Sequence, residues 1–369
     1  MRYRRGMDVS PFPYQGPLEP EQVRGRRELI ADLTERLTEH RVTALLGPRR
    51  YGKTSVLRRV ASDVIHAGVA IVWVDFYEVV SMADVAARLD EALARVPGRF
   101  RQLATKLAAA AEINLGVVKF ELRSASDGRP DPMLVVHGLL EVLTKSAEDH
   151  PTVVIFDEFA GIARIEGAAG LLRTKLQHHY QRLGIVFAGS EVSMMRMLFA
   201  EQAQPFYSQA DLVEIGPLSN VEVVELVSEG FVATSRDAGP LPALVSRFTG
   251  GHPQRTMQMA DAAWRLVGPG EAATEATWSD ALDNVRASTS DGNERLYSSL
   301  QPGEKSVLRA LAGGGSIFGA AAQVLDLATG TAQHARKTLT DRGHLIHVDG
   351  AYSIVDPIFA DWIRNRFPI

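Results

Sequence analysis

The stretch GPRRYGKTS, residues 47–55, follows the apolar run VTALL (42–46) and opens the helical pattern TSVLRRVASDVIH (54–66). It matches G-x-x-x-x-G-K-[ST] in full, in the strand–loop–helix setting that a phosphate-binding loop requires. The glycines let backbone N–H groups curl around a phosphate, and the helix N-terminus adds its dipole. The stretch therefore predicts a nucleoside triphosphate site, with ATP or ADP as the ligand. The loop residues expected to contact the nucleotide are Gly47, Pro48, Arg49, Arg50, Tyr51, Gly52, Lys53, Thr54 and Ser55.

A second motif, TVVIFDEF (152–159), is a buried-strand pattern that ends in two carboxylates. In a phosphoryl-transfer site Asp157 would join Thr54 as a ligand of Mg²⁺, while Lys53 would neutralise the β- and γ-phosphates. Glu158 would orient or deprotonate the attacking water, an arrangement that argues against a small-molecule kinase, because it would waste ATP. The alternative is that the acidic pair only caps the strand end.

Three further polar residues are candidates for the same site. Ser190 ends the apolar run GIVFAGS (184–190) and could bond the γ-phosphate or its water, although a serine that caps a turn is common. His252 and Arg255 stand at a Gly-Gly-His-Pro helix entry and could contact phosphate, or simply cap and flank that helix. The predicted catalytic residues are Lys53, Asp157, Glu158 and Ser190.

The order of patterns predicts an α/β fold, with a parallel sheet wrapped by helices. Four strands are expected at 42–47, 70–76, 152–159 and 184–190, and the alternation in 115–124 suggests a further strand or hairpin. Strand patterns stop after GPLS (216–219), where helices take over. From Gln301 three helices and a hairpin about Asp349-Gly350 are typical of a winged helix. The predicted domains are an ATPase core at 1–217, a helical lid at 218–300 and a winged-helix domain at 301–369.

Composition excludes several classes of protein. The 369 residues are 46% hydrophobic and 23% charged, as in ordinary globular proteins, and the net charge is only −4. The absence of cysteine excludes disulfides and Cys-ligated metal sites. No stretch is apolar for long enough to form a signal peptide or membrane helix. We expect a soluble cytoplasmic protein with no membrane partner.

In a winged helix the third helix would enter the major groove of DNA. Here it offers Gln333 for a base edge and Arg336 and Lys337 for phosphates. Residues 291–369 carry eight basic and eight acidic side chains, so the module is neutral and lacks the excess positive charge of a strong DNA binder. Double-stranded DNA therefore stays one candidate partner. The other is a protein contact, in which this module acts as an interaction or autoinhibitory domain.

The whole set of motifs resembles archaeal-ATPase-type P-loop proteins, within the wider group of STAND and initiator-like AAA+ ATPases. Besides the loop and VVIFDEF, the resemblance rests on PFPYQGP (11–17), GRREL (25–29), FAGSEVSMM (187–195), PLS (217–219), TGGHP (249–253) and AYSIVDPIFADWIR (351–364). It implies an ASCE-type P-loop core, a helical lid and a winged helix. It also implies that GRREL, with Arg26, packs near the adenine, that Ser190 is a sensor, and that His252 or Arg255 contacts phosphate from the lid.

One position departs from the pattern of the family. Relatives tend to carry an arginine after a Pro-aromatic-Tyr-Gly stretch, whereas PFYSQ (205–209) has Gln209 there. An arginine finger contributes about 10³–10⁵ in rate, so hydrolysis should be slow unless Arg196, Arg182 or another residue replaces it. We expect a slow Mg²⁺-dependent ATP hydrolase that acts as a nucleotide-controlled switch. The alternatives are a DNA-loading or transposition-helper ATPase, which needs a homo-oligomer, and a non-hydrolysing nucleotide-dependent binding module.

Overall fold

The fold was determined as a computed structural model. The structure describes residues 9–110, 113, 115–116, 131–348 and 350–369. The chain divides into two compact units. The sheet unit comprises Arg27–Gly47 and Lys53–Ile215, and the helical unit comprises Met1–Arg26, Pro48–Gly52 and Gly216–Ile369. Each unit is treated by itself below. The finer division into core, lid and winged-helix domains stays a prediction.

The sheet unit is built on a five-stranded parallel sheet in the order β2-β3-β4-β1-β5. β4 thus lies between β1, which leads into the phosphate loop, and β3, which ends in the two carboxylates. This confirms the predicted α/β class. The strands are β1 (Val42–Leu46), β2 (Ala70–Asp75), β3 (Thr152–Asp157), β4 (Leu183–Gly189) and β5 (Asp211–Glu214).

The four predicted strands are present, and β5 is an addition that the sequence patterns missed. β3 and β4 are buried along their whole length, as expected for apolar runs inside a parallel sheet. β5 has only four residues at an edge of the sheet, and three of them are exposed. Such a strand lacks the apolar run by which the others were found.

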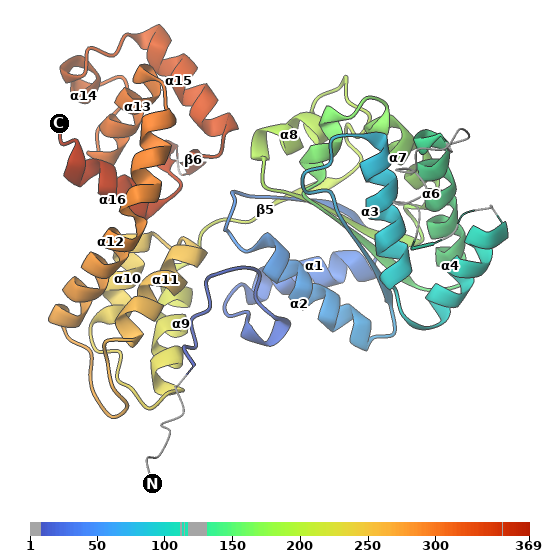
Figure 1. The fold of residues 1–369 in the computed structure, drawn as a ribbon, viewed down its shortest axis with the longest axis horizontal. Helices are drawn as coiled ribbons and strands as arrows, with labels where there is room; N and C mark the ends of the chain where they lie inside the picture. Colours follow the sequence, from blue (N-terminus) through green and yellow to red (C-terminus); the bar gives the residue numbers. More distant parts are fainter. Residues whose placement is uncertain (1–8, 111–112, 114, 117–130, 349) are drawn as a thin grey trace. The chain divides into compact units, whose positions relative to one another are not determined.

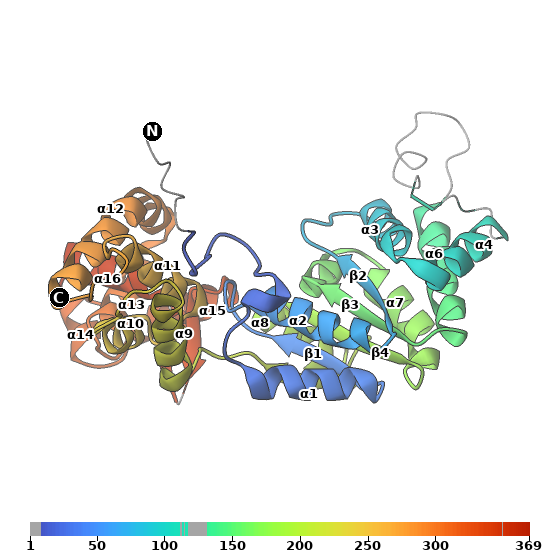
Figure 2. The same ribbon diagram turned by 90° about the horizontal axis from the view of Figure 1, so that it is seen from below.

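Helices cover both faces of this sheet. Figure 2 shows α1 (Arg27–Thr38) on the opposite face from α3 (Met82–Arg95) and α6 (Pro132–Glu148). α2 (Lys53–His66) packs beside α1, and α4 (Gly98–Ala110) packs against α6. The segments that follow β3 and β4 are η2 (Phe159–Arg164), α7 (Ala168–Leu176), η3 (Gln177–His179) and α8 (Val192–Ala200).

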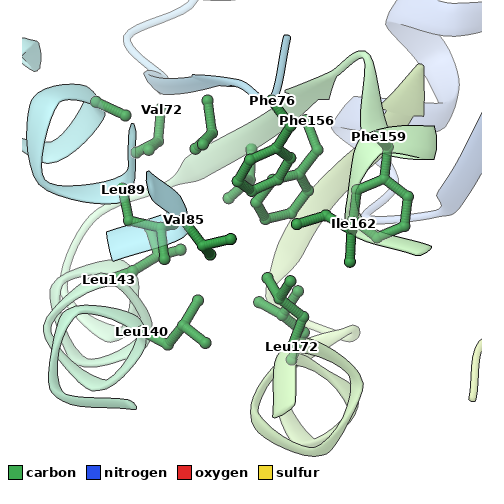
Figure 3. Packing of buried hydrophobic residues seen from close by; sticks show 14 of the residues in the cluster. Val72, Phe76, Val85, Leu89, Leu140, Leu143, Phe156, Phe159, Ile162 and Leu172 are labelled. Carbon is green, nitrogen blue, oxygen red and sulfur yellow. The ribbon is translucent and has the colours of Figure 1, made fainter. Parts of the chain in front are cut away.

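An aromatic cluster fixes the ends of β3 and β4 in the core. Figure 3 shows Phe76, Phe156 and Phe159 above the helix side chains Leu140 and Leu172. The rings of Phe76 and Phe156 are stacked, and that of Phe159 is tilted to both. Phe159 is fully buried, and its ring lies 4.5 Å from that of Phe187 in β4. Because Phe159 directly follows Glu158, this packing fixes the point at which the chain leaves β3.

The helical unit contains the predicted run of helices after residue 216. Figure 1 shows the long helix α12 running from the α9–α11 group to the C-terminal helices. A two-stranded antiparallel hairpin, β6 (Leu345–Val348) and β7 (Ala351–Ile354), follows α15. The helices are η1 (Pro20–Gln22), α9 (Asn220–Val232), α10 (Leu241–Thr249), α11 (Pro253–Trp264), α12 (Glu275–Ser299), α13 (Pro302–Ala312), α14 (Ala320–Val324), α15 (Thr329–Asp341) and α16 (Pro357–Arg366).

The segment before η1, residues 9–19, is an irregular leader, yet it is well packed. Phe12 is only 2% exposed and contacts Phe231 of α9, with ring centroids 5.8 Å apart. A Cβ added at Gly230 would lie 2.3 Å from Cζ of Phe12, so the glycine makes room for the ring. The leader is therefore part of the core of the helical unit.

Two stretches of sequence, 115–124 and 168–183, have patterns of secondary structure that the described residues do not show in full. The strand or hairpin expected over 115–124 lies almost entirely outside the described residues, and Leu115 and Gly116 form a turn. The sequence pattern of residues 168–183 favours one helix, but α7 ends at Leu176, where the chain passes into the 3-10 turn η3. Within the described parts of the chain, no helix is long and apolar enough to span a membrane.

Candidate functional site

The phosphate loop begins at Gly47, directly after β1, and ends at Lys53, the first residue of α2. Lys53 is 5% exposed, and its Nζ donates a hydrogen bond to the carbonyl oxygen of Gly47 at 2.7 Å. This bond closes the loop across its base. Both residues belong to the sheet unit, whereas Pro48, Arg49, Arg50, Tyr51 and Gly52 belong to the helical unit. Arg50 and Gly52 have φ values of 68° and 87°, which lie in the left-handed region.

In the sheet unit the second residue of α2 meets the end of β3. Thr54 Oγ1 donates to Asp157 Oδ2 at 3.0 Å, across 103 positions of sequence. Asp157 is 5% exposed. Burial and the neighbouring Glu158 carboxylate raise the pKa of Asp157 to about 6, against the opposing effect of the Thr54 hydrogen bond. The two predicted metal ligands, Thr54 and Asp157, are therefore in contact. A bound cation would stabilise the charged form of the buried Asp157 carboxylate.

The oxygen atoms at this point suit a hard divalent cation. Mg²⁺ prefers carboxylate, hydroxyl, phosphate and water oxygens, and it is usually held by one or two protein carboxylates. Thr54 and Asp157 match such a donor set, with the remaining positions left to phosphates and water. Among the described residues no group of three or more histidine and acidic side chains could hold a metal by itself, so these residues fit a nucleotide-bound Mg²⁺ rather than an all-protein metal centre.

Glu158 and Ser190 are also in contact. Glu158 has a left-handed φ of 49°, and its N–H donates to Asp157 Oδ1 at 3.1 Å. Ser190 donates to Glu158 Oε2 from both its backbone N–H at 3.1 Å and its Oγ at 2.7 Å. Because β4 lies beside β3, the ends of the two strands deliver these residues to one place. The glutamate is thus oriented by the residue that sequence reasoning proposed as a sensor.

The tip of the loop is held inside the helical unit. The guanidinium of Arg26 donates to the carbonyl oxygen of Tyr51 at 3.3 Å and to that of Gly216 at 2.7 Å. The backbone N–H of Arg26 donates to the carboxylate of Glu222. Burial lowers the pKa of Arg26 to about 10, and Glu222 opposes this shift. Arg26 therefore braces the loop through backbone carbonyls.

His252 contacts the loop tip from the start of α11. Its ring lies edge-on to Tyr51, with centroids 5.0 Å apart, and Nδ1 accepts the backbone N–H of Arg255 at 3.3 Å. Burial lowers the pKa of His252 to about 4, which the nearby Asp356 partly offsets. The imidazole is therefore neutral at pH 7, so it both caps α11 and packs against the loop. The guanidinium of Arg255 is directed to Asp356.

Apart from Gln333, the residues proposed for DNA contact and the residues considered for the missing arginine contact other residues of the chain. Arg336 lies over the Tyr352 ring at 4.8 Å, Lys337 pairs with Asp341 at 2.7 Å, and Gln333 is exposed. Gln209 donates to the carbonyl of Tyr207 at 3.4 Å. Exposed ion pairs join Arg196 to Glu214 and Arg182 to Glu148.

Replacing Gly47 with alanine is expected to disturb both folding and nucleotide binding. The added Cβ would lie 2.2 Å from Cγ2 and 2.8 Å from the carbonyl oxygen of Ile215, and the N–H of Ile215 is bonded to Leu46. Overpacking of this kind costs about 1–3 kcal/mol. Urea unfolding and nucleotide titration measure both effects. Gly170→Ala, in an open position of α7, should be neutral or stabilising. Equal stability and binding in Gly47→Ala would refute the expectation.

Sequence reasoning missed two acidic residues that organise the helical unit. Glu222 caps α9 in a capping box with Ser219 and also binds the backbone of Arg26. Asp356 caps α16 and pairs with Arg255. The Ser-x-x-Glu pattern at 219–222 and the Asp-Pro at 356–357 indicate helix starts in the sequence. Their long-range partners are not visible in it.

Comparison with known proteins gives one family and several solved structures. The profile of a family described as an ATPase domain predominantly from Archaea matches residues 25–259. The fold is similar to that of a Walker-type ATPase of Pyrococcus abyssi, with a TM-score of 0.72 and 20% identity over 96% of this chain and 99% of that one. It is also similar to the ORC2 protein of Aeropyrum pernix, solved as ADPNP–ADP complexes, with a TM-score of 0.57 and 17% identity over 96% of each chain. A search of curated proteins returned no match.

Proposed function

This chain belongs to the family of ATPase domains found predominantly in Archaea, and from that premise we propose that it is a slow, Mg²⁺-dependent ATP hydrolase that works as a nucleotide-controlled switch. The observation that carries the proposal is the pair of contacts at the ends of β3 and β4. Thr54 meets Asp157, and Ser190 holds Glu158. These contacts, after a complete phosphate loop, support the proposal that Asp157 is a ligand of Mg²⁺ and that Glu158 is the general base.

In this mechanism each residue has one task. Lys53 and the loop N–H groups would bind the phosphates, and Thr54 and Asp157 would hold Mg²⁺, which would neutralise phosphate charge. Glu158 accepts a proton from the water that attacks the γ-phosphorus, and ADP and inorganic phosphate leave. Ser190 keeps the Glu158 carboxylate in position through two hydrogen bonds.

Slow turnover is expected because the position at which the family tends to carry an arginine is occupied by Gln209. Gln209 has no cationic group, and Arg196 and Arg182 are each in an exposed ion pair. P-loop NTPases without an arginine supplied in trans turn over at roughly 10⁻⁴ to 10⁻² s⁻¹. Hydrolysis at such a rate resets a bound state rather than supplying product.

The output of the switch is proposed to pass through the helical unit. The loop tip contacts Arg26 and His252 there, so a change in the loop has direct neighbours on which to act. The partner is a protein or duplex DNA. The paired state of Lys337 and the stacking of Arg336 on Tyr352 favour a protein partner, because both cations would have to leave those contacts to bind phosphates.

Measurement of ATP turnover tests the proposal. We expect the wild type to hydrolyse ATP slowly with Mg²⁺, and Lys53→Met to reduce the rate at least about tenfold. Lys106→Met, which removes an exposed lysine of α4, is the matched control and should retain the wild-type rate. No turnover in the wild type would favour a non-hydrolysing binding module. An equal rate in Lys53→Met would show that the hydrolysis does not arise at the loop.

The same assay with mixed-sequence duplex DNA separates the two classes of partner. Stimulation of turnover, or binding whose affinity falls steeply with salt, would support DNA. In that case Arg336→Ala should weaken binding. If DNA neither binds nor stimulates, the α15 helix is not a recognition helix and a protein partner is the remaining candidate.

A further inference from the structure

An ion pair inside the helical unit joins α11 to α16. Arg255 Nε donates to Asp356 Oδ1 at 3.0 Å, and its Nη2 donates to Asp356 Oδ2. Their side chains are 10% and 25% exposed. Arg255 Nη1 also donates to Gln258 at 2.5 Å. A two-pronged contact of this kind between largely buried charged groups is among the stronger side-chain interactions.

A second cation, Arg50 of the loop tip, lies near this pair. Burial lowers the pKa of Arg50, the nearby Arg255 lowers it further, and Asp356 opposes both effects. His252 is neutral at pH 7, because burial lowers its pKa to about 4. The guanidinium groups of Arg50 and Arg255 therefore both lie near the carboxylate of Asp356, at the tip of a loop whose proposed ligand is an anion.

We propose that Asp356 and the phosphates of a bound nucleotide compete for Arg255, so that α16 controls how tightly the loop holds its nucleotide. This inference rests on the proposed function and adds to it a residue from the C-terminal module. When Asp356 holds Arg255, the loop has one cation fewer for phosphate. When a nucleotide takes Arg255, α16 loses a contact to α11. By linkage, each event weakens the other by the same factor.

The chain allows this to be tested without breaking a helix. Asp356 is the N-cap of α16 and accepts the N–H groups of Ile358 and Phe359 at 3.0 and 3.4 Å. Asparagine caps a helix as well as aspartate does, so Asp356→Asn removes the charge and keeps the cap. Asp356→Ser, which also retains a capping oxygen, is the second variant.

The same helix provides a matched control. Asp361 of α16 receives two hydrogen bonds from Arg286 of α12, at 2.9 and 3.1 Å, and its side chain is 8% exposed. Asp361→Asn therefore weakens a comparable arginine–aspartate contact between α16 and a neighbouring helix. It leaves the contact between Arg255 and Asp356 unchanged. If loosening of α16 were enough to change nucleotide affinity, this variant would show it.

The experiment is a fluorescence titration of the full-length protein with mant-ADP and mant-ATPγS, in the presence of Mg²⁺. We expect Asp356→Asn and Asp356→Ser to bind at least one nucleotide about fivefold or more tightly than the wild type, the lower end of ordinary coupling between sites. Asp361→Asn should stay within about twofold. In an Arg255→Gln background, Asp356→Asn should have no further effect, because the competition acts through Arg255.

Two outcomes would overturn the inference while leaving the proposed function in place. One is that Asp356→Asn binds no more tightly than Asp361→Asn. The other is that the full gain persists with Arg255→Gln, which would mean that Asp356 acts only as a negative charge near the nucleotide. If neither the wild type nor any variant binds nucleotide, the proposed function itself fails and the competition fails with it.

Discussion

Replacing Glu158 with glutamine is expected to reduce ATP turnover by about 10²–10⁴-fold, the usual contribution of a positioned general base. Glutamine keeps the size of the side chain and an oxygen that can still accept both hydrogen bonds of Ser190. The contacts of Lys53, Thr54 and Asp157 are untouched, so the affinity for ATP should stay within about twofold. Single-turnover hydrolysis and equilibrium binding measure the two quantities separately.

Glu191 supplies the control for this substitution. It follows Ser190 at the end of the same strand, but it pairs with Arg164 at the surface. Glu191→Gln should therefore hydrolyse ATP within about twofold of the wild-type rate. If Glu158→Gln also kept the wild-type rate, Glu158 would not be the base, and the contact with Ser190 would be structural.

Replacing Phe12 with alanine is expected to destabilise the helical unit by about 3–5 kcal/mol, the range for a buried phenylalanine. The ring is 2% exposed and fills the space that Gly230 leaves beside Phe231. Gly230, where an added Cβ would lie 2.3 Å from the ring, has no side chain to fill the cavity. The leader should then lose its attachment to α9.

Urea unfolding followed by tryptophan fluorescence measures this effect. Phe318→Ala is the control, because that ring is 50% exposed, and it should change the stability by no more than about 0.5 kcal/mol. An equal loss in both variants, or none in Phe12→Ala, would show that the leader is not part of the core. The helical unit holds three of the four tryptophans, Trp264, Trp278 and Trp362, and the sheet unit holds Trp73.

The features that could be predicted are those that depend on residues close together in the sequence. β3 and β4 are continuous apolar runs because both of their faces are buried. The loop from Gly47 to Lys53 is a contiguous sequence motif, and its glycines let the backbone N–H groups surround a phosphate. β5 escaped because it is short, lies at the edge and is mostly exposed.

What could not be predicted depends on which distant residues meet. The burial of Phe12 is decided by α9, more than two hundred residues later. Likewise Arg255 and Asp356 are separated by 101 positions, and each, taken alone, is an ordinary residue at the start of a helix. The contact between Ser190 and Glu158 could be predicted only in part. It requires that β4 lie beside β3, and the order of the elements along the chain does not determine this neighbourhood by itself.

Hydrogen exchange of the Glu158→Gln variant tests the switch most directly, because this variant should hold ATP without converting it. Peptides from α11 and α16 are compared with MgATP bound and with MgADP bound, at saturating nucleotide. We expect the two states to differ in protection at these helices, while peptides from α6, in the core of the sheet unit, stay the same. Identical protection of α11 and α16 in both states would contradict a nucleotide-controlled switch that acts through the helical unit.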